Sequence, residues 1–338
     1  GDWQKTYLGE LVQLEEYSYD SQEARQYFAY DKVRDGLFTL TQTMLGLTYK
    51  PYEAEVWHAS VQSYEVWDGD EIIGRFHLDM HPRDGKFKHA AAFPMLPGVT
   101  SKQLPEVALV CNVPGGDGTP GLMSHGQVRT FFHEFGHLLH HILGGNHQWV
   151  ALSGIATEWD FVEAPSQLLE EWIWDKASLQ SFAFNEAGEP IPDELVEKMQ
   201  AARKFGNGLG TRHQMYYAAL SLNYYNRSPD EINTTDLMVE LMEQYSPFHY
   251  IDDTYFMCSF GHLDGYSAIY YTYMWSLVIA KDLFSRFEAE GMLNPEVAGQ
   301  YRRFILEPGG SKPAAELVQD FLGREYNFEA FANWLISK

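Results

Sequence analysis

The stretch FFHEFGHLLHH, residues 131–141, places four histidines and one glutamate within eleven residues. On an α-helix, residues four apart lie one turn apart on the same face, so His133 and His137 can aim their ring nitrogens at one ion. His137 and His141 repeat this spacing, but only the first pair has a carboxylate, Glu134, directly after its leading histidine. This is the H-E-x-x-H pattern, in which two histidines hold zinc and the glutamate acts on a water molecule beside it. The stretch therefore predicts the metal-binding helix of a zinc hydrolase.

The remaining residues of this stretch are less specific. His140 lies two turns from His133, about 10 Å along the axis, and cannot share an ion with it. We expect His140 to pack or hydrogen-bond with neighbouring elements and His141 to be either a surface residue or a packing residue. Gly136 costs about 1 kcal/mol relative to alanine in a helix. It indicates either a group that passes close to the backbone or tight packing against a neighbouring helix.

A third zinc ligand must come from another segment, because a catalytic site needs three protein ligands and one open position. The best source is TEWDFVEAPSQLLEEW, residues 157–172, where Glu163 lies among apolar side chains. A buried carboxylate needs a partner, which is either the metal ion or, alternatively, an arginine. Asp160, one turn earlier, is placed to orient a ligand histidine. Pro165 either kinks this helix or marks its first turn.

The composition limits the class of protein. The 338 residues carry a formal net charge of −23, which repels phosphate backbones and argues against nucleic-acid binding. No run of about 18 apolar residues is present, so we expect no membrane span. Two distant cysteines form no CxxC pair and favour a reducing compartment. We therefore expect a cytoplasmic location. A periplasmic or secreted location is the alternative, because the chain begins at Gly1 and a leader could have been removed.

The chain divides into three segments of different pattern. Residues 1–50 have a helical apolar period, whereas SYEVWDGDEIIGRFHLDMHP, within residues 54–113, predicts a β-hairpin that turns at Asp68-Gly69-Asp70. The segments KHAAAFPM and EVALVCNVP add strands, for a small sheet of about three to five. Residues 125–338 are mostly helical. We predict one mainly α (α+β) domain over residues 1–338, with a helical entry segment, a small β element and a helical core.

Together these segments resemble the thimet oligopeptidase and neurolysin family of zinc metallopeptidases, which also includes oligopeptidase A and dipeptidyl carboxypeptidase. The resemblance rests on four motifs in the same order, FHEFGHLLHH, DFVEAPSQLLEEW, FGHLDGYSAIYYTYMWS and LEPGGSKPAAELVQDFLGRE. It covers almost the whole chain and implies a zincin-like helical catalytic domain. It also implies one zinc ion per chain, held by His133, His137 and Glu163, with Glu134 as the general base.

The third motif carries the residues that the resemblance assigns to the reacting carbonyl. Its positions imply that Tyr273 is the main phenolic donor beside the zinc and that Tyr266 and His262 contact the substrate backbone or the tetrahedral intermediate. They imply further that Tyr270 contributes to a substrate subsite. Donors aimed at the carbonyl oxygen lower the barrier because negative charge develops there. From the sequence alone, the three tyrosines at helical spacing would also fit a packed aromatic stripe.

Three features depart from the family pattern. Family members usually have two adjacent glycines between the histidine and the first tyrosine, whereas HLDGY, residues 262–266, has one. The acidic HDEV upstream of the zinc helix is HGQV here, residues 125–128, which removes two negative charges near the site. Full-length members also carry an amino-terminal helical lobe. We therefore expect a missing lobe, a partner chain or self-association to complete the substrate channel.

The resemblance implies zinc-dependent hydrolysis of internal bonds in short peptides, with Glu134 passing a proton from water to the leaving amine. Two alternatives stay open. A dipeptidyl carboxypeptidase would need a cationic group for the terminal carboxylate of the substrate, and Arg212 is available for this purpose. A truncated catalytic half that keeps zinc would be a peptide-binding module, although a pure binder has no need of Glu134. Short peptides are the expected partners in each case.

Overall fold

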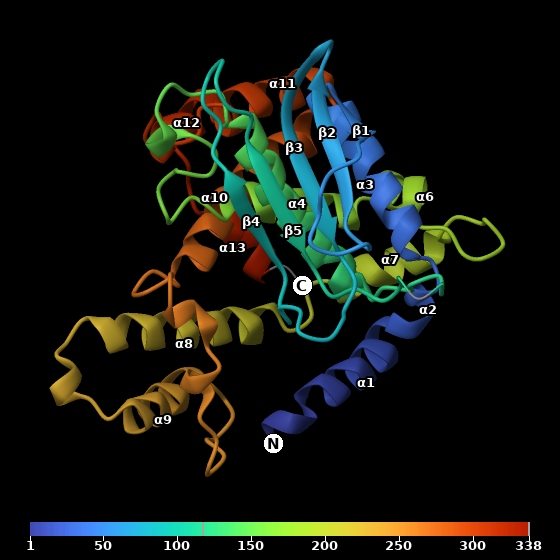
Figure 1. Ribbon diagram of the computed structural model, residues 1–338. Helices are drawn as coiled ribbons and strands as arrows, with labels where there is room; N and C mark the ends of the chain where they lie inside the picture. The colour runs from blue at the N-terminus through green and yellow to red at the C-terminus, as the bar shows by residue number, and fades with distance from the viewer. Residues whose placement is uncertain (117, 337–338) are drawn as a thin grey trace.

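The computed structural model describes residues 1–116 and 118–336 as a helical body with a five-stranded sheet (Figure 1). The strands are β1 (Leu47–Pro51), β2 (Gln62–Asp68), β3 (Glu71–Asp79), β4 (Ala91–Leu96) and β5 (Glu106–Val110). The α-helices are α1 (Lys5–Tyr17), α2 (Ser21–Arg25), α3 (Tyr30–Leu45), α4 (His125–Leu143), α5 (Ala164–Leu169), α6 (Lys176–Phe182), α7 (Asp193–Ala202), α8 (Asn207–Tyr225), α9 (Thr234–Tyr245), α10 (Thr272–Glu290), α11 (Pro295–Tyr301), α12 (Ala314–Leu322) and α13 (Glu329–Ile336). A 3-10 turn, η3 (Glu170–Trp174), directly continues α5. The predicted fold class, mainly α (α+β) with a small β-sheet, is confirmed.

The sheet has the strand order β1-β2-β3-β5-β4. Strands β2 and β3 form the predicted hairpin, in which Asp68 pairs with Glu71 and Gly69 in the turn has a φ of 58°. Strand β5 lies parallel to β3, and β4 pairs antiparallel with β5 at one edge of the sheet. Phe76 of β3 and Leu109 of β5 are fully buried and direct the apolar face of the sheet toward the helices.

The prediction of helix for residues 1–50 is wrong at its end. Helix α3 ends at Leu45, where Gly46 takes a left-handed conformation with a φ of 68°, which residues with a Cβ atom rarely adopt. Residues 47–51 then pair antiparallel with β2 as an edge strand. In this strand Leu47 and Tyr49 are buried, and an apolar alternation of this length is too short to indicate a strand in the sequence.

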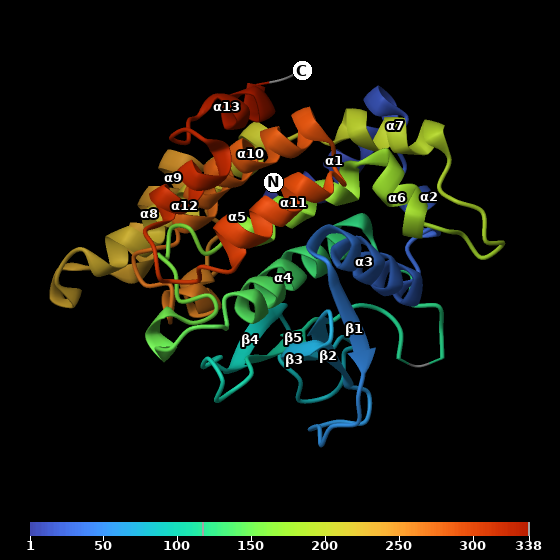
Figure 2. The same cartoon turned by 90° about the horizontal axis from the view of Figure 1, so that it is seen from above.

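Helix α4 lies at the centre of the fold. It contacts β3, β4 and β5 on one side and α5 on the other, and α5 in turn packs against α10. The sheet, α4, α5 and α10 therefore succeed one another as layers (Figure 2). Fully buried aromatic side chains fill this core, among them Phe131 and Phe135 of α4 and Trp172 of η3. This arrangement fixes α4 rigidly between the sheet and α5.

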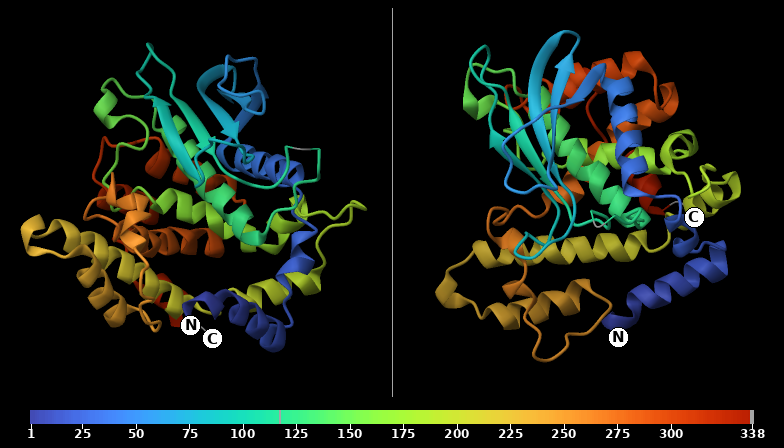
Figure 3. Two further views of the ribbon diagram at one scale, coloured as in Figure 1. Left: turned by 60° about the horizontal axis from the view of Figure 1, so that its bottom comes forward. Right: turned by 45° about the vertical axis from the view of Figure 1, so that its right-hand side comes forward.

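Further helices lie beneath this body. Helices α8 and α9 pack on each other around a second apolar cluster, which includes Tyr216, Leu220, Phe260 and Tyr270. Figure 3 shows this pair and α1 extending below the part of the molecule that contains the sheet. The segment between α9 and α10 belongs to the second cluster and so joins the two parts. None of the helices in the described part of the chain combines the length and the apolar character needed to cross a bilayer.

Candidate metal centre

The predicted metal-binding helix is α4, His125–Leu143. A capping box fixes its start, since the Gln127 backbone N–H donates to the Ser124 hydroxyl and the Ser124 N–H donates to the Gln127 side chain. His133 and His137 lie one turn apart on this helix, with ring centroids separated by 5.0 Å. Both rings are directed at Glu163.

The other two histidines of the stretch pack in the core. His140 is fully buried, and burial lowers its pKa to about 3. His141 is also buried, with its Nε2 atom 2.9 Å from the Leu96 carbonyl oxygen of β4. His140 therefore packs as predicted, and of the two alternatives for His141 the packing position is correct and the surface position is wrong.

Gly136 lets α5 approach α4 at the level of the two directed histidines. A Cβ atom on residue 136 would lie 2.6 Å from Ser166 Cα and 3.2 Å from the Pro165 carbonyl oxygen, closer than packed atoms tolerate. Tight helix packing is thus the reason for this glycine. Pro165 lies in the first turn of α5, where a missing N–H costs no hydrogen bond, so it starts the helix and does not kink it. Glu163 is the N-cap residue that immediately precedes α5.

The side chains of His133, His137 and Glu163 converge on one point. Glu163 Oε2 lies 3.1 Å from His133 Nε2 and 3.0 Å from His137 Nε2. One potential ligand atom from each residue lies within 4.8 Å of the other two. Glu163 is only 1% exposed, and in residues 1–116 and 118–336 it forms no ion pair with an arginine. Two imidazoles and one carboxylate form the donor set of catalytic zinc sites that keep a position open, so these residues fit a zinc ion.

Glu170 supports His133 from the other side of its ring. His133 Nδ1 donates to Glu170 Oε1 over 2.7 Å, which leaves Nε2 as the ligand atom. The predicted partner Asp160 does not do this, because its carboxylate accepts from the Tyr271 hydroxyl at 3.1 Å. Glu170 was not among the predicted site residues. Its spacing of seven residues from Glu163 was the available signal, because that spacing returns to the same helical face.

Glu134 is buried but has no partner. It is 8% exposed. Within the described ranges 1–116 and 118–336, no group forms a hydrogen bond or an ion pair with its carboxylate. Both carboxylate oxygens nevertheless keep some solvent exposure, so the group can accept a proton from a water molecule. The residue directly follows His133, and its charge acts on Tyr266, whose hydroxyl contacts Glu163.

Three predicted residues of the segment before and within α10 lie next to the ligands. The Tyr266 hydroxyl donates to Glu163 Oε1 over 3.1 Å. The Tyr266 ring stacks on that of Tyr273, with centroids 5.8 Å apart and an interplanar angle of 13°. The Tyr273 hydroxyl lies 3.1 Å from His262 Nε2. The structure thus brings Tyr266, Tyr273 and His262 together around the third ligand.

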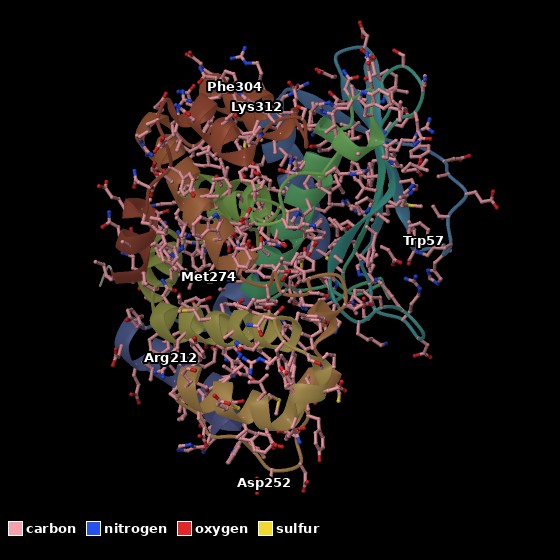
Figure 4. All side chains as sticks on the ribbon, turned by 90° about the vertical axis from the view of Figure 1, so that its left-hand side faces the viewer. Trp57, Arg212, Asp252, Met274, Phe304 and Lys312 are labelled. Atoms are coloured by element: carbon pink, nitrogen blue, oxygen red, sulfur yellow. The ribbon has the colours of Figure 1, made fainter. Side chains whose placement is uncertain are left out.

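Tyr270 is placed differently. It is 7% exposed, its hydroxyl donates to Gln214 Oε1 of α8 at 3.1 Å, and its ring lies 5.1 Å from that of His262. Tyr270 is therefore a packed aromatic residue, and its ring lies against that of His262. Arg212 also lies on α8, in the lower part of the molecule (Figure 4), and its Nη2 atom donates to the Gln244 carbonyl oxygen at 3.1 Å.

Hydrogen bonds hold the start of α10 on the segment that carries Glu163. Gln167 Nε2 donates to the Tyr273 carbonyl oxygen at 2.9 Å, and Thr272 Oγ1 donates to the Trp159 carbonyl oxygen at 2.5 Å. The Gln167 Oε1 atom is buried without a partner. Gln167 therefore makes one hydrogen bond at the cost of leaving another buried atom unpaired. The bond that it makes fixes the backbone of Tyr273 relative to Glu163.

The electrostatics of the site favour a cation at the metal ligands and keep the neighbouring phenols protonated. Burial lowers the pKa of His133, but the two carboxylates Glu163 and Glu170 outweigh burial and raise that pKa well above its usual range; a metal cation at Nε2 would be favoured by the same carboxylates and would take the place of the proton. Burial raises the pKa of Tyr273 and of Tyr266, and the charge of Glu163 raises both further. Both phenols therefore keep their protons near neutral pH and can donate hydrogen bonds to a developing negative charge.

The known proteins that resemble this chain include several oligopeptidases. The chain is 33% identical over 343 residues to the thimet-like oligopeptidase of Dictyostelium discoideum, and the alignment covers 97% of this chain and 51% of that protein. It is 34% identical over 341 residues to oligopeptidase A of Escherichia coli, with 97% and 50% covered. The chain spans about half the length of the curated relatives it matches.

Solved structures share the fold at lower sequence identity. The structure of CHT aligns with a TM-score of 0.57 at 15% identity, covering 99% of this chain and 66% of that chain. PZ peptidase A with inhibitor 2 aligns with a TM-score of 0.55 at 17% identity, covering 76% and 42%. At these identities the likeness concerns the fold alone, a zincin-like helical domain with a small sheet. Because the model of peptidase family M3 matches residues 2–335, nearly the whole sequence, the chain belongs to this family of metallopeptidases.

Proposed function

We propose that the chain is a zinc-dependent oligopeptidase that hydrolyses internal bonds of short peptides. The observation that carries this proposal is the convergence of His133, His137 and Glu163 within 4.8 Å, beside the unpartnered carboxylate of Glu134. A structural zinc site would have four protein ligands, whereas three leave a position for the reacting groups. Membership of family M3 and relatives named as oligopeptidases support the same class of reaction.

Each residue of the site has a proposed part in this reaction. A bound zinc ion would supply the Lewis acid that activates the water and the scissile carbonyl. Glu134 takes a proton from the attacking water and returns it to the leaving amine. Tyr273 and Tyr266, together with His262, donate hydrogen bonds to the carbonyl oxygen as it becomes negative. The raised pKa values of the two phenols support this part, because a phenolate could not donate.

We propose that the substrate channel needs a wall that the residues aligned here do not supply. The alignment covers 51% of the Dictyostelium relative, so a second lobe, a partner chain or self-association would supply the opposite wall. Loss of that wall should weaken peptide binding without moving the metal ligands. We also propose a cytoplasmic location. The free thiols of Cys111 and Cys258 support it, since a reducing compartment preserves free thiols.

The test is cleavage of a quenched fluorescent peptide of about nine residues by the purified, zinc-loaded chain and by its Glu134→Gln variant. We expect turnover that a chelator abolishes, and a loss of about 10²–10⁴-fold in the variant, as for removal of a general base. Both proteins should bind one zinc ion per chain. A wild-type protein that binds zinc but cleaves nothing would instead support the peptide-binding half-enzyme.

A further inference from the structure

The surface of α4 that leads to the metal ligands is open and carries a basic side chain. Gly126, Arg129 and Thr130 are exposed and His133 is partly exposed, whereas residues 134–143 of the same helix are buried. Positions three and four residues apart share one face of a helix. The open face therefore ends at the metal ligands, and Arg129 lies on it one turn before His133.

Arg129 is held at one edge of its guanidinium group. Its Nε atom donates to Glu170 Oε2 at 2.5 Å, and Glu170 Oε1 accepts from His133. The Arg129 side chain is nevertheless 56% exposed. In the part of the chain that the structure describes, its two Nη atoms have no hydrogen-bond partner. A guanidinium that is fixed on one edge and open on the other is preorganised to bind a carboxylate.

The spacing along α4 sets where such a carboxylate would lie in a substrate. Arg129 precedes His133 by four residues, which corresponds to about 6 Å along a helix axis. An extended peptide covers about 3.4 Å per residue, so the same distance corresponds to about two residues. The first turn of α4 contains no acidic residue that would compete for the guanidinium. Glu170 compensates part of the Arg129 charge, and Glu171 also acts on it, so the attraction for a substrate carboxylate comes from the two Nη atoms that point away from this pair.

Arg212, the cation that the sequence suggested for a terminal carboxylate, is less suited to this purpose. It lies on α8, outside the layers that hold the metal ligands, and one of its Nη atoms is engaged by the Gln244 carbonyl oxygen. It is therefore the matched control for substitutions of Arg129.

We propose that Arg129 binds a carboxylate of the substrate about two residues from the cleaved bond, so that anionic peptides are preferred. This inference rests on the proposed peptidase function and specifies its substrate class. The carboxylate has two sources. Capture of a C-terminal carboxylate would release dipeptides, whereas capture of an aspartate or glutamate side chain would direct cleavage within a longer peptide.

The test compares matched fluorogenic peptides that differ by one charge. One pair ends two residues after the cleaved bond as a free acid or an amide. The other pairs are amidated and carry glutamate or glutamine two residues before or after that bond. For the wild-type protein we expect kcat/KM to be about tenfold higher for the carboxylate member of one pair, because a charge-assisted hydrogen bond contributes about that much. This ratio should be smaller at high salt, which screens the charges. In Arg129→Gln this ratio should fall to about one, whereas Arg212→Gln should keep it.

The ratio cancels any general loss of activity that follows from breaking the pair between Arg129 and Glu170. Arg129→Lys keeps the charge but not the planar fork, so an intermediate ratio is expected. Calorimetric binding of a nonhydrolysable ketomethylene pair, acid and amide, gives a readout that needs no turnover. Binding of the acid that depends on Arg129, without any cleavage, would refute the proposed peptidase and support this inference. A ratio near one in the wild-type protein, or one that survives Arg129→Gln, would overturn the inference and leave the peptidase standing.

Discussion

The Gly136→Ala substitution tests whether the contact between α4 and α5 builds the metal site. The added Cβ atom would lie 2.6 Å from Ser166 Cα, whereas ordinary contacts begin at 3.4 Å, a shortfall of 0.8 Å. The two nearest atoms, Ser166 Cα and the Pro165 carbonyl oxygen, belong to the backbone of α5, so the helix itself must move. Glu163 precedes α5 by one residue and would move with it, away from His133 and His137.

Two opposing terms set the expected loss of stability. Overpacking of this kind costs about 1–3 kcal/mol, and replacing glycine by alanine within a helix returns about 1 kcal/mol. We therefore expect the free energy of unfolding of the metal-free protein to fall by about 1 kcal/mol. A ligand displaced by several tenths of an ångström exceeds the tolerance of about 0.2 Å in metal–ligand distances, so zinc affinity should fall at least about tenfold.

The assay is urea unfolding in the presence of a chelator, together with zinc titration against a chromophoric competitor. Gly210→Ala is the matched control, because Gly210 lies within α8 and a Cβ atom there would meet nothing within 4 Å. That control should raise stability by up to about 1 kcal/mol and leave zinc affinity unchanged. If Gly136→Ala behaves like the control in both measurements, the contact between α4 and α5 does not set the position of the third ligand.

Three further predictions concern single side chains. Glu170→Gln removes the charge that holds its histidine partner, so zinc affinity should fall about 10–100-fold in a competition titration, and an unchanged affinity would contradict this. Gln167→Met keeps the size of the side chain but loses its hydrogen bond to the Tyr273 carbonyl oxygen, so kcat should fall about tenfold with KM little changed. The control Gln200→Met removes a similar hydrogen bond on α7 and should change neither kcat nor KM. Burial raises the pKa of Asp79, but hydrogen bonds, the strongest from Arg83, outweigh it and lower that pKa below its usual range. The stability that Asp79 contributes is therefore present above about pH 4 and is lost as pH falls further, and Asp79→Asn should show a smaller acid loss in denaturant unfolding between pH 7 and 3.

The parts of the fold that could be predicted from the sequence are those with local signals. The spacing of His133 and His137 predicted α4, and an alternating pattern broken at Gly69 predicted the hairpin of β2 and β3. The parallel pairing of β3 with β5 has no such signal, because it depends on which edge of β3 is left free after β2 has paired. Pairing between distant strands is decided by the whole core and not by neighbouring residues.

The same distinction holds for the candidate site. Glu163 was placed from its apolar surroundings, and the structure directs it at both histidines. Glu170 was missed, since a carboxylate next to Glu171 in a helical segment resembles an ordinary charged surface residue until α4 covers it. The packing of Tyr270 against α8 could not be predicted from the sequence either. Helical spacing alone does not decide which tyrosine faces the metal and which faces the core.

The metal ligands lie close to one another in the sequence, whereas the tyrosines of the site lie far from them. His133, His137 and Glu163 lie within 30 positions, 133 to 163, whereas Tyr266 follows Glu163 by 103 positions. Contacts that close short loops form with less loss of entropy than contacts that close long ones. During refolding, a chain can therefore hold its ion before the tyrosine segment has docked. Zinc binding would then precede the formation of the complete catalytic site. We therefore expect a folding intermediate that holds zinc but does not cleave peptides.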